Sequence, residues 1–340
     1  VLSLMGTGAL GIVMALSMNY VTALIAFFLF AVTTSFVFWA ALNKGLRIIG
    51  GKEDSGSTYG WYYALGSVIS LVCGLGFWAL YTSTENSHDA MFRTIMAMSI
   101  AVIVSGVLVQ ITFKEENASL AQTAEEDKFR LSDVGKAIKN PYLWWASIIM
   151  FLIYTIYSNV SYFTPYLSSQ VGMDVSDSSF LGIIRGYVFY FLSPVGGYIA
   201  DKLLKSTLRL YGYGFIGLAV LFFAATRVPA GEDSVAIAIV ISLLASAFAM
   251  MLYGVMWSIL NEIDIPISYA ATAIGISSMV IYLPDLFVPA MIGSWLDNYG
   301  EEAGYFRMFI FFGICCMLAV VLSLTLAERV KMMKAAKKIK

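Results

Sequence analysis

Stretches of about 20 consecutive apolar residues recur along nearly the whole chain, separated by short polar connections. A helix of about 20 residues, rising 1.5 Å per residue, crosses the roughly 30 Å hydrocarbon core of a bilayer. A barrel strand would be about ten residues long and would alternate apolar with polar positions. The pattern therefore predicts ten membrane-spanning helices: Val1–Met18, Val21–Leu42, Trp61–Ser83, Ala90–Phe113, Leu143–Leu167, Phe180–Leu203, Leu210–Val228, Val235–Leu260, Ala271–Trp295 and Tyr305–Leu326.

The composition agrees with a chain that is surrounded mostly by lipid. Of the 340 residues, 59% are hydrophobic and 13% are charged, whereas an average soluble domain carries about 25% charged residues. The formal net charge of −1 provides no basic field for nucleic acid. The three cysteines, two of them adjacent, match neither a disulfide framework nor a zinc-ligand spacing. We therefore expect an all-α, polytopic integral membrane protein whose partner is the lipid bilayer, with no nucleic acid and no metal site.

Lysine and arginine are distributed unevenly over the connections. Alternate connections and the C-terminal tail together hold 17 of the 21 basic residues, so these lie on one face of the membrane protein. Cytoplasmic connections carry such an excess of positive charge. We therefore expect a multi-pass protein of the plasma (inner) membrane with both ends of this chain in the cytoplasm, as an even number of crossings requires.

One connection is long and rich in both acidic and basic residues, and it divides the ten runs into four and six. It ends in a short amphipathic stretch, Leu131–Ile138. Because no polar segment precedes the first run, we expect two further helices upstream of Val1; a natural ten-helix protein is the alternative. The predicted parts are a partial N-terminal bundle of four helices (1–113), a central cytoplasmic loop (114–142), a C-terminal six-helix bundle (143–327) and a basic cytoplasmic tail (328–340).

A short charged segment lies in the cytoplasmic connection after the sixth run, Gly197-Tyr-Ile-Ala-Asp201-Lys202-Leu-Leu-Lys205. It resembles the G-x-x-x-D-[RK]-x-x-[RK] loop motif of the major facilitator superfamily, at the place of the second-half copy of that motif. The division of the helices around a charged central loop also resembles the plan of that superfamily. The resemblance implies two helical bundles, the first of them incomplete in this chain, that enclose a central cavity.

Three other stretches are similar to the same family. Lys139–Trp144 resembles the entry to its seventh helix, and Gly293–Gly300 resembles the end of its eleventh. The stretch after Trp39 resembles the branch of sugar-phosphate and organic-anion permeases. The residues that carry this last resemblance are Arg47, Gly50, Glu53, Gly56 and Gly60.

The loop motif implies a cytoplasmic gate formed by Gly197, Asp201, Lys202 and Lys205. A carboxylate beyond a helix end can accept hydrogen bonds from the free amides at the N-terminus of a neighbouring helix. By the pseudo-symmetry of the superfamily, that neighbour would start near Gly56–Trp61. The alternative is that these cations only anchor the chain at the lipid headgroups.

Two ionisable residues lie well inside the apolar runs, where a charge is costly and points to function. Asp285 stands near the middle of its run between two prolines, which break a helix locally. It is either a proton-coupling carboxylate or the partner of a cationic group; a structural aspartate satisfied by the broken turn is the alternative. Arg185 could bind an anionic substrate with two parallel hydrogen bonds, or it could extend to the outer headgroups. Arg93, closer to the end of its run, is expected to be an interface anchor.

Polar aromatic residues recur at helical spacing in the fifth run, so they share one face of the helix. Such a polar face is unfavourable against lipid but favourable against a water-filled cavity. The resemblance makes this run a cavity-lining helix and pairs it with the eighth run. The expected substrate-binding residues are Tyr154, Tyr157, Asn159, Tyr253, Trp257, Arg185 and, from the first four helices, Trp39. The alternative for any of these aromatic residues is the interface belt, where we place Tyr162 and Tyr166.

The sequence contains no nucleotide-binding, metalloprotease or serine-hydrolase motif. We therefore expect no cofactor and no enzyme activity. The predicted function is a secondary transporter, a permease or symporter for a small solute such as an organic anion, driven by an ion gradient (a proton is preferred to sodium) or by exchange. The alternatives are a receptor or sensor with a carrier fold, a polytopic membrane enzyme acting on lipid, and a channel.

Overall fold

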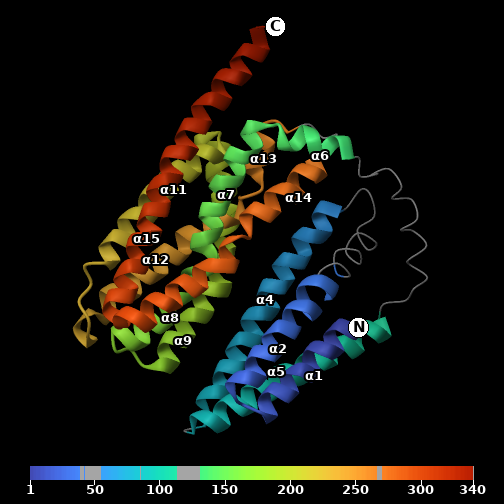
Figure 1. The fold of residues 1–340 in the computed structure, drawn as a ribbon, viewed down its shortest axis with the longest axis vertical. Coiled ribbons are helices and arrows are strands. Elements are labelled where there is room, and N and C mark those ends of the chain that lie inside the picture. The colour runs from blue at the N-terminus through green and yellow to red at the C-terminus, as the bar shows by residue number, and fades with distance from the viewer. Residues whose placement is uncertain (39–41, 43–54, 85, 113–130, 266–269, 340) are drawn as a thin grey trace. The chain divides into compact units, whose positions relative to one another are not determined.

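The computed structural model describes residues 1–38, 42, 55–84, 86–112, 131–265 and 270–339 (Figure 1). In that part of the chain every regular element is a helix, as the apolar runs predict. The chain divides into two compact units, Val1–Lys128 and Phe129–Lys340.

The first unit is built from apolar helices joined by polar connections. The side chain of Asn19 starts its second helix by accepting the N–H of Thr22 at 2.9 Å. The first and last helices of the unit approach closely, because a Cβ atom on Gly8 would lie only 2.9 Å from the carbonyl oxygen of Ser99. The elements of this unit are α1 (Leu2–Leu16), α2 (Tyr20–Ala31), the π-helical η1 (Val32–Phe38), α4 (Ser55–Thr82) and α5 (Ser87–Thr112).

The second unit contains the remaining elements. It begins with α6, whose bounds, Leu131–Ile138, coincide with the predicted amphipathic stretch. The elements that follow are α7 (Pro141–Asn159), η3 (Val160–Tyr162), α8 (Phe163–Pro165), η4 (Tyr166–Gln170), α9 (Val175–Ile183), η5 (Ile184–Val188), η6 (Phe189–Leu192), α10 (Ser193–Tyr198), η7 (Ile199–Leu204), α11 (Thr207–Ala225), η8 (Glu232–Ser234), α12 (Val235–Gly254), α13 (Ser258–Glu262), α14 (Ala270–Ile281) and α15 (Pro284–Ile339).

Two spans of the second unit are not regular α-helices. The stretches Pro141–Gln170 and Val175–Leu204 each run for 30 residues and change between α-helical, π-helical and 3-10 geometry. The first stretch starts with Asn140, whose side chain accepts the N–H of Tyr142, followed by Pro141 in the first turn. Local π-helical turns are common at functional sites, and one of them, η5, carries Arg185.

The predicted break next to Asp285 is present. Helix α14 ends at Ile281, and α15 starts at Pro284, where the missing N–H of proline costs nothing. A second interruption lies at Gly300, whose φ of 76° leaves the helical region and separates α15 into two helices. Glycine adopts this positive φ without the steric penalty that a side chain would bring.

All ten predicted runs overlap apolar helices. Among the described residues, 7 helices are long and apolar enough to span a membrane, and α1 and α2 are shorter. The number is below ten because of these two helices, and because one 65-residue stretch, Thr272–Ala336, includes the last two predicted runs. The fold is that of an all-α polytopic membrane protein.

The core of the second unit lies where α7, α11, α12 and α15 meet, and Figure 1 shows α11 beside α15. Phe215, Phe222 and Phe309 are almost fully buried there. Tyr166 is also buried, with 3% of its surface exposed, and its ring meets Phe309 edge-on at 4.9 Å. The placement of Tyr166 in the interface belt was therefore wrong, because its ring packs against other aromatic rings of the protein.

Candidate functional site

Arg185 is the most unusual charged residue in the described part of the chain. Its side chain is 2% exposed. Its Nη1 atom donates to Ser242 Oγ at 3.4 Å, its Nη2 atom donates to Thr164 Oγ1, and its Nε atom has no partner. No carboxylate among the described residues pairs with it. A buried cation is therefore held by neutral hydroxyl groups alone.

Small residues make the room that Arg185 occupies. A Cβ atom on Gly182 would lie 2.9 Å from Thr164 Oγ1, so a larger residue would displace the hydroxyl that bonds to Arg185, whereas its 3.7 Å distance to Arg185 Nη2 is an ordinary contact. On the other side, a Cβ atom on Gly186 would meet nothing within 4 Å. Gly182 therefore leaves room for the Thr164 hydroxyl that bonds to Arg185, and Gly186 leaves open space next to it in the chain.

That space belongs to a cavity of about 350 Å³. Small-molecule sites usually begin at about 300 Å³ and combine apolar walls with a few polar groups. The cavity is lined by hydroxyl-bearing and aromatic residues from both 30-residue stretches and by Met250 of α12. The polar members of the lining are Tyr157, Ser158, Ser161, Thr164, Arg185, Tyr187 and Tyr190.

A cluster of tyrosines joins this cavity to α12. The ring of Tyr157 stacks on the ring of Tyr253 with 3.6 Å between their centroids and an angle of 3°. The hydroxyl groups of Tyr157 and Tyr190 share a hydrogen bond. The ring of Tyr154 lies beside both rings of the stack, with centroid distances of 5.9 Å to Tyr157 and 6.3 Å to Tyr253. Three of the predicted substrate-binding residues therefore form one aromatic group.

Asp285 lies at the other end of this cluster. The hydroxyl of Tyr154 donates to Asp285 Oδ2 at 2.6 Å. The ring of Tyr282, just before the start of α15, meets the Tyr154 ring edge-on at 4.8 Å. Asp285 is exposed rather than buried. Its carboxylate is thus accessible and is hydrogen-bonded to the same tyrosine that contacts the Tyr157–Tyr253 stack.

Of the predicted substrate-binding residues, Arg185 and Tyr157 line the cavity, and Tyr154 and Tyr253 contact the Tyr157 ring. Asn159 is 2% exposed, and its amide donates to the Thr155 carbonyl oxygen and to Ser158 Oγ, so its polar group is used within its own helix. Trp257 is 37% exposed and does not line the cavity. Trp39 lies outside the described residues.

Sequence reasoning missed several neighbours of Arg185 and Tyr154. Ser242 and Thr164, which hold the guanidinium, are single hydroxyl residues within or near apolar stretches, and their partner is far away along the chain. Tyr190 and Tyr282 also escaped attention. A signal was present for Tyr190, which follows Arg185 by five positions in the same run.

The residues of the predicted gate occupy α10 and η7. Asp201, Lys202 and Lys205 are exposed, and Lys205 ends the segment with a left-handed φ of 52°. The adjacent Gly196 allows α10 to pack against α12, since a Cβ atom there would lie 2.8 Å from the Met251 carbonyl oxygen. A Cβ atom on Gly197 would make only an ordinary contact, 3.9 Å from Val255 Cγ1. The contact of Asp201 with a helix of the first unit remains a prediction.

A carboxylate does fix the connection that follows this motif. Glu262 of α13 accepts the N–H of Leu208 at 2.9 Å and the hydroxyl of Ser206. Ser206 Oγ in turn accepts the N–H of Arg209 at 3.1 Å. The N-terminus of α11 is therefore capped by two side chains, one of them charged, which suits the positive end of a helix dipole.

Comparison with known proteins adds independent information. Residues 1–289 match the family model described as the Major Facilitator Superfamily. The chain is 27% identical over 331 residues to the inner membrane protein YqcE of Escherichia coli (strain K12), covering 96% of this chain and 77% of that protein. It is 24% identical over 335 residues to the inner membrane protein YihN of the same organism, covering 98% and 80% respectively.

Proposed function

Because this chain belongs to the major facilitator superfamily, a family of membrane transporters, we propose that it is a secondary active transporter for a small organic anion. Sugar phosphates and sugar acids are the solutes that we favour. In such a transporter two helical bundles expose a central site alternately to each side of the membrane. We further propose the inner membrane as its location, with both ends of this chain in the cytoplasm.

The observation that carries the choice of an anion is the buried Arg185. Removing a guanidinium from water costs several kcal/mol unless an opposite charge and further hydrogen bonds compensate. Arg185 receives two hydroxyl partners and no carboxylate among the described residues, and its Nε–H is unused. An anion in the adjacent cavity would supply the missing charge.

The rest of the lining suits the same class of solute. A guanidinium presents parallel N–H groups that match a carboxylate or a phosphate. Tyr157 and Tyr190 bring hydroxyl groups to the cavity that can bond to the hydroxyls of a sugar. The volume of about 350 Å³ favours a small solute over a lipid.

Asp285 is the proposed coupling residue, and a proton is the proposed coupling ion. An ionised carboxylate accepts the hydroxyl of Tyr154, whereas a protonated one has a hydrogen of its own to donate. A change of protonation at Asp285 therefore changes the hydrogen bond of Tyr154, which contacts the tyrosine stack beside the cavity. This route connects the coupling ion to the solute site through ring contacts. The exposed residues Asp201, Lys202 and Lys205, with Gly197, are the proposed cytoplasmic gate.

Uptake into proteoliposomes tests the proposal. The protein, reconstituted with an inward proton gradient, should accumulate radiolabelled sugar phosphates or sugar acids, and Arg185→Gln should abolish that uptake. Arg93→Gln is the matched control, because Arg93 is also in an apolar helix but is exposed and bonds to Thr84. Binding of an anion without any uptake would instead identify a receptor with a carrier fold. Equal uptake by the Arg185→Gln variant would refute the proposed anion site.

A further inference from the structure

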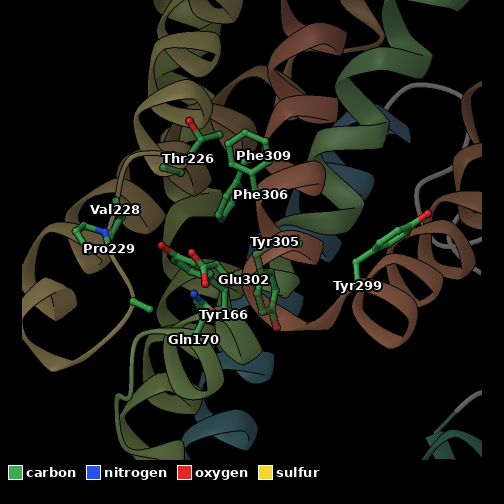
Figure 2. A pocket seen from close by; sticks show the side chains of 13 residues that line it. Tyr166, Gln170, Thr226, Val228, Pro229, Tyr299, Glu302, Tyr305, Phe306 and Phe309 are labelled. Atoms are coloured by element: carbon green, nitrogen blue, oxygen red, sulfur yellow. The ribbon is translucent and has the colours of Figure 1, made fainter.

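A second cavity, of about 390 Å³, lies elsewhere in the second unit and shares no lining residue with the Arg185 cavity (Figure 2). Three segments surround it: the η4 turn that ends the first 30-residue stretch, the end of α11 with the connection that follows it, and the part of α15 around Gly300. The connection after α11 belongs to the face opposite the basic connections, so we place this cavity on the non-cytoplasmic side.

The floor of this outer cavity is made of buried aromatic rings. Tyr166 and Tyr305 are each 3% exposed, and Phe309 is 1% exposed. The ring of Tyr166 meets Tyr305 at 5.2 Å and Phe309 at 4.9 Å, both edge to face. The faces of aromatic rings carry partial negative charge and attract cations, most strongly at sites shielded from water. A floor of this kind favours an organic cation over an anion.

The charge at the rim of the cavity also favours a cation. Among the residues that line the cavity, Glu302 is the one with a charged side chain, and it makes no ion pair with any described residue. Glu302, Tyr166 and Gln170 line the same cavity, and Figure 2 shows Tyr299 apart from them. Tyr299 already has a cation, because Arg307 sits 3.2 Å from the centre of its ring.

The neighbouring basic residue does not fill the site. Arg227 stands between two lining residues, Thr226 and Val228, but is exposed and does not itself line the cavity. The carboxylate of Glu302 is exposed and available to a ligand, and Phe306, which also lines the cavity, offers an aromatic ring that is 49% exposed.

We propose that the outer cavity binds an organic ammonium group, with the positive nitrogen beside Glu302 and its alkyl substituents against Phe306 and the aromatic floor. This ligand chemistry has two possible sources, a soluble amine on the outer side and the ammonium headgroup of a membrane phospholipid. The site is separate from the proposed transport site, and it carries the opposite charge.

Binding of radiolabelled choline to the detergent-purified protein tests this proposal. The wild-type protein should bind choline, and Glu302→Gln should weaken that binding by about tenfold or more, because it removes a charge-assisted contact. Glu301→Gln is the matched control, since Glu301 is exposed and adjacent in sequence but does not line the cavity. Thermal unfolding of both variants in the absence of ligand should match the wild type, which shows that neither is misfolded.

Competition experiments then identify the source of the ligand. 3,3-Dimethylbutan-1-ol has the shape of choline without its charge, and it should fail to displace choline. Displacement by short-chain phosphatidylethanolamine but not by phosphatidylglycerol would assign the site to a lipid headgroup; displacement by ethanolamine and not by that lipid would assign it to a soluble amine. Equal loss of binding in both glutamate variants, no loss in either, or equal displacement by the neutral alcohol would overturn the proposal. A negative result here leaves the Arg185 proposal unaffected, because the two cavities share no residue.

Discussion

Arg93 and Arg185 are both placed inside apolar runs by the sequence, yet their surroundings differ. Arg93, in the first unit, is exposed and lies near the start of α5, where its Nη1 atom donates to Thr84 Oγ1 at 3.2 Å. Arg185, in the second unit, is buried, with two hydroxyl partners from other elements. Arg93 can extend to the headgroups and keep its charge in water, whereas Arg185 cannot.

The difference shows what makes an intramembrane charge a candidate for function. Position within an apolar run is shared by both arginines and does not distinguish them. The distinguishing observations are burial without a counter-charge and an adjoining cavity, and both apply only to Arg185 of this pair.

Replacing Arg185 should have the largest effect. We expect Arg185→Gln to reduce the transport of an anionic solute by about 100-fold or more, because a buried, charge-assisted interaction of about 3 kcal/mol is lost. Arg185→Lys keeps the charge but not the paired N–H groups, and should retain a measurable fraction of the rate. Initial rates of uptake in proteoliposomes measure both effects. Identical loss in the two variants would show that the positive charge is not what matters.

Replacing Asp285 tests whether the carboxylate serves the coupling ion or serves Arg185. Asp285→Asn should prevent the solute from accumulating above its equilibrium concentration, while exchange of labelled for unlabelled solute continues. The amide of asparagine neither binds nor releases a proton near neutral pH, so it cannot carry the coupling proton. Accumulation that is unchanged in this variant would contradict the coupling role.

The double variant Arg185→Gln with Asp285→Asn sharpens the same test. If the two residues formed an ion pair during transport, removing both charges would restore part of the activity lost in either single variant. We expect no such restoration, since the structure places a tyrosine rather than an arginine against Asp285.

Removing only the hydroxyl of Tyr154 should have a smaller effect. Tyr154→Phe keeps the ring contacts with Tyr157 and Tyr253 but loses the hydrogen bond to Asp285. A loss of about 0.5–1.5 kcal/mol corresponds to a reduction of about 2- to 12-fold in coupled transport. The measurement is the initial rate of gradient-driven uptake, which should fall in this variant and stay unchanged in the control Tyr282→Phe. An unaltered rate in Tyr154→Phe would remove Tyr154 from the coupling route.

The smallest effect is expected for Arg93. Arg93→Gln should leave the uptake rate within about twofold of the wild type, because an exposed side chain at an interface contributes little to the solute site. A large loss in this variant would mean that burial does not separate the two arginines.

Much of the fold was predictable because bilayer thickness dictates helix length. The ten apolar runs, the amphipathic helix at Leu131–Ile138 and the break at Pro284 follow from hydropathy and from the chemistry of proline. The count of separate spanning helices was less predictable. A single glycine with positive φ divides α15, and α1 and α2 are shorter than their runs.

The site was predictable only in part. Helical spacing suggested that Tyr154 and Tyr157 share a face, and the structure brings both together with Tyr253 of a distant helix. Asn159 and Tyr166 do not have the surroundings that the sequence predicted, for the same reason. The amide of Asn159 bonds within its own helix and the ring of Tyr166 packs against Phe309, and periodicity in a sequence does not reveal such partners. The hydroxyls around Arg185 come from segments 21 and 57 positions away, which only tertiary structure can reveal.

The most direct test of the Arg185 site is ligand-dependent thermal unfolding of the purified protein. A ligand that binds only the folded state raises the unfolding temperature by an amount that grows with the logarithm of its concentration relative to its Kd. Against a panel of sugar phosphates, sugar acids, carboxylates and inorganic anions, we predict that at least one anion stabilises the wild-type and Arg93→Gln proteins and does not stabilise Arg185→Gln. Stabilisation of all three proteins by the same anion would contradict a binding site built around Arg185.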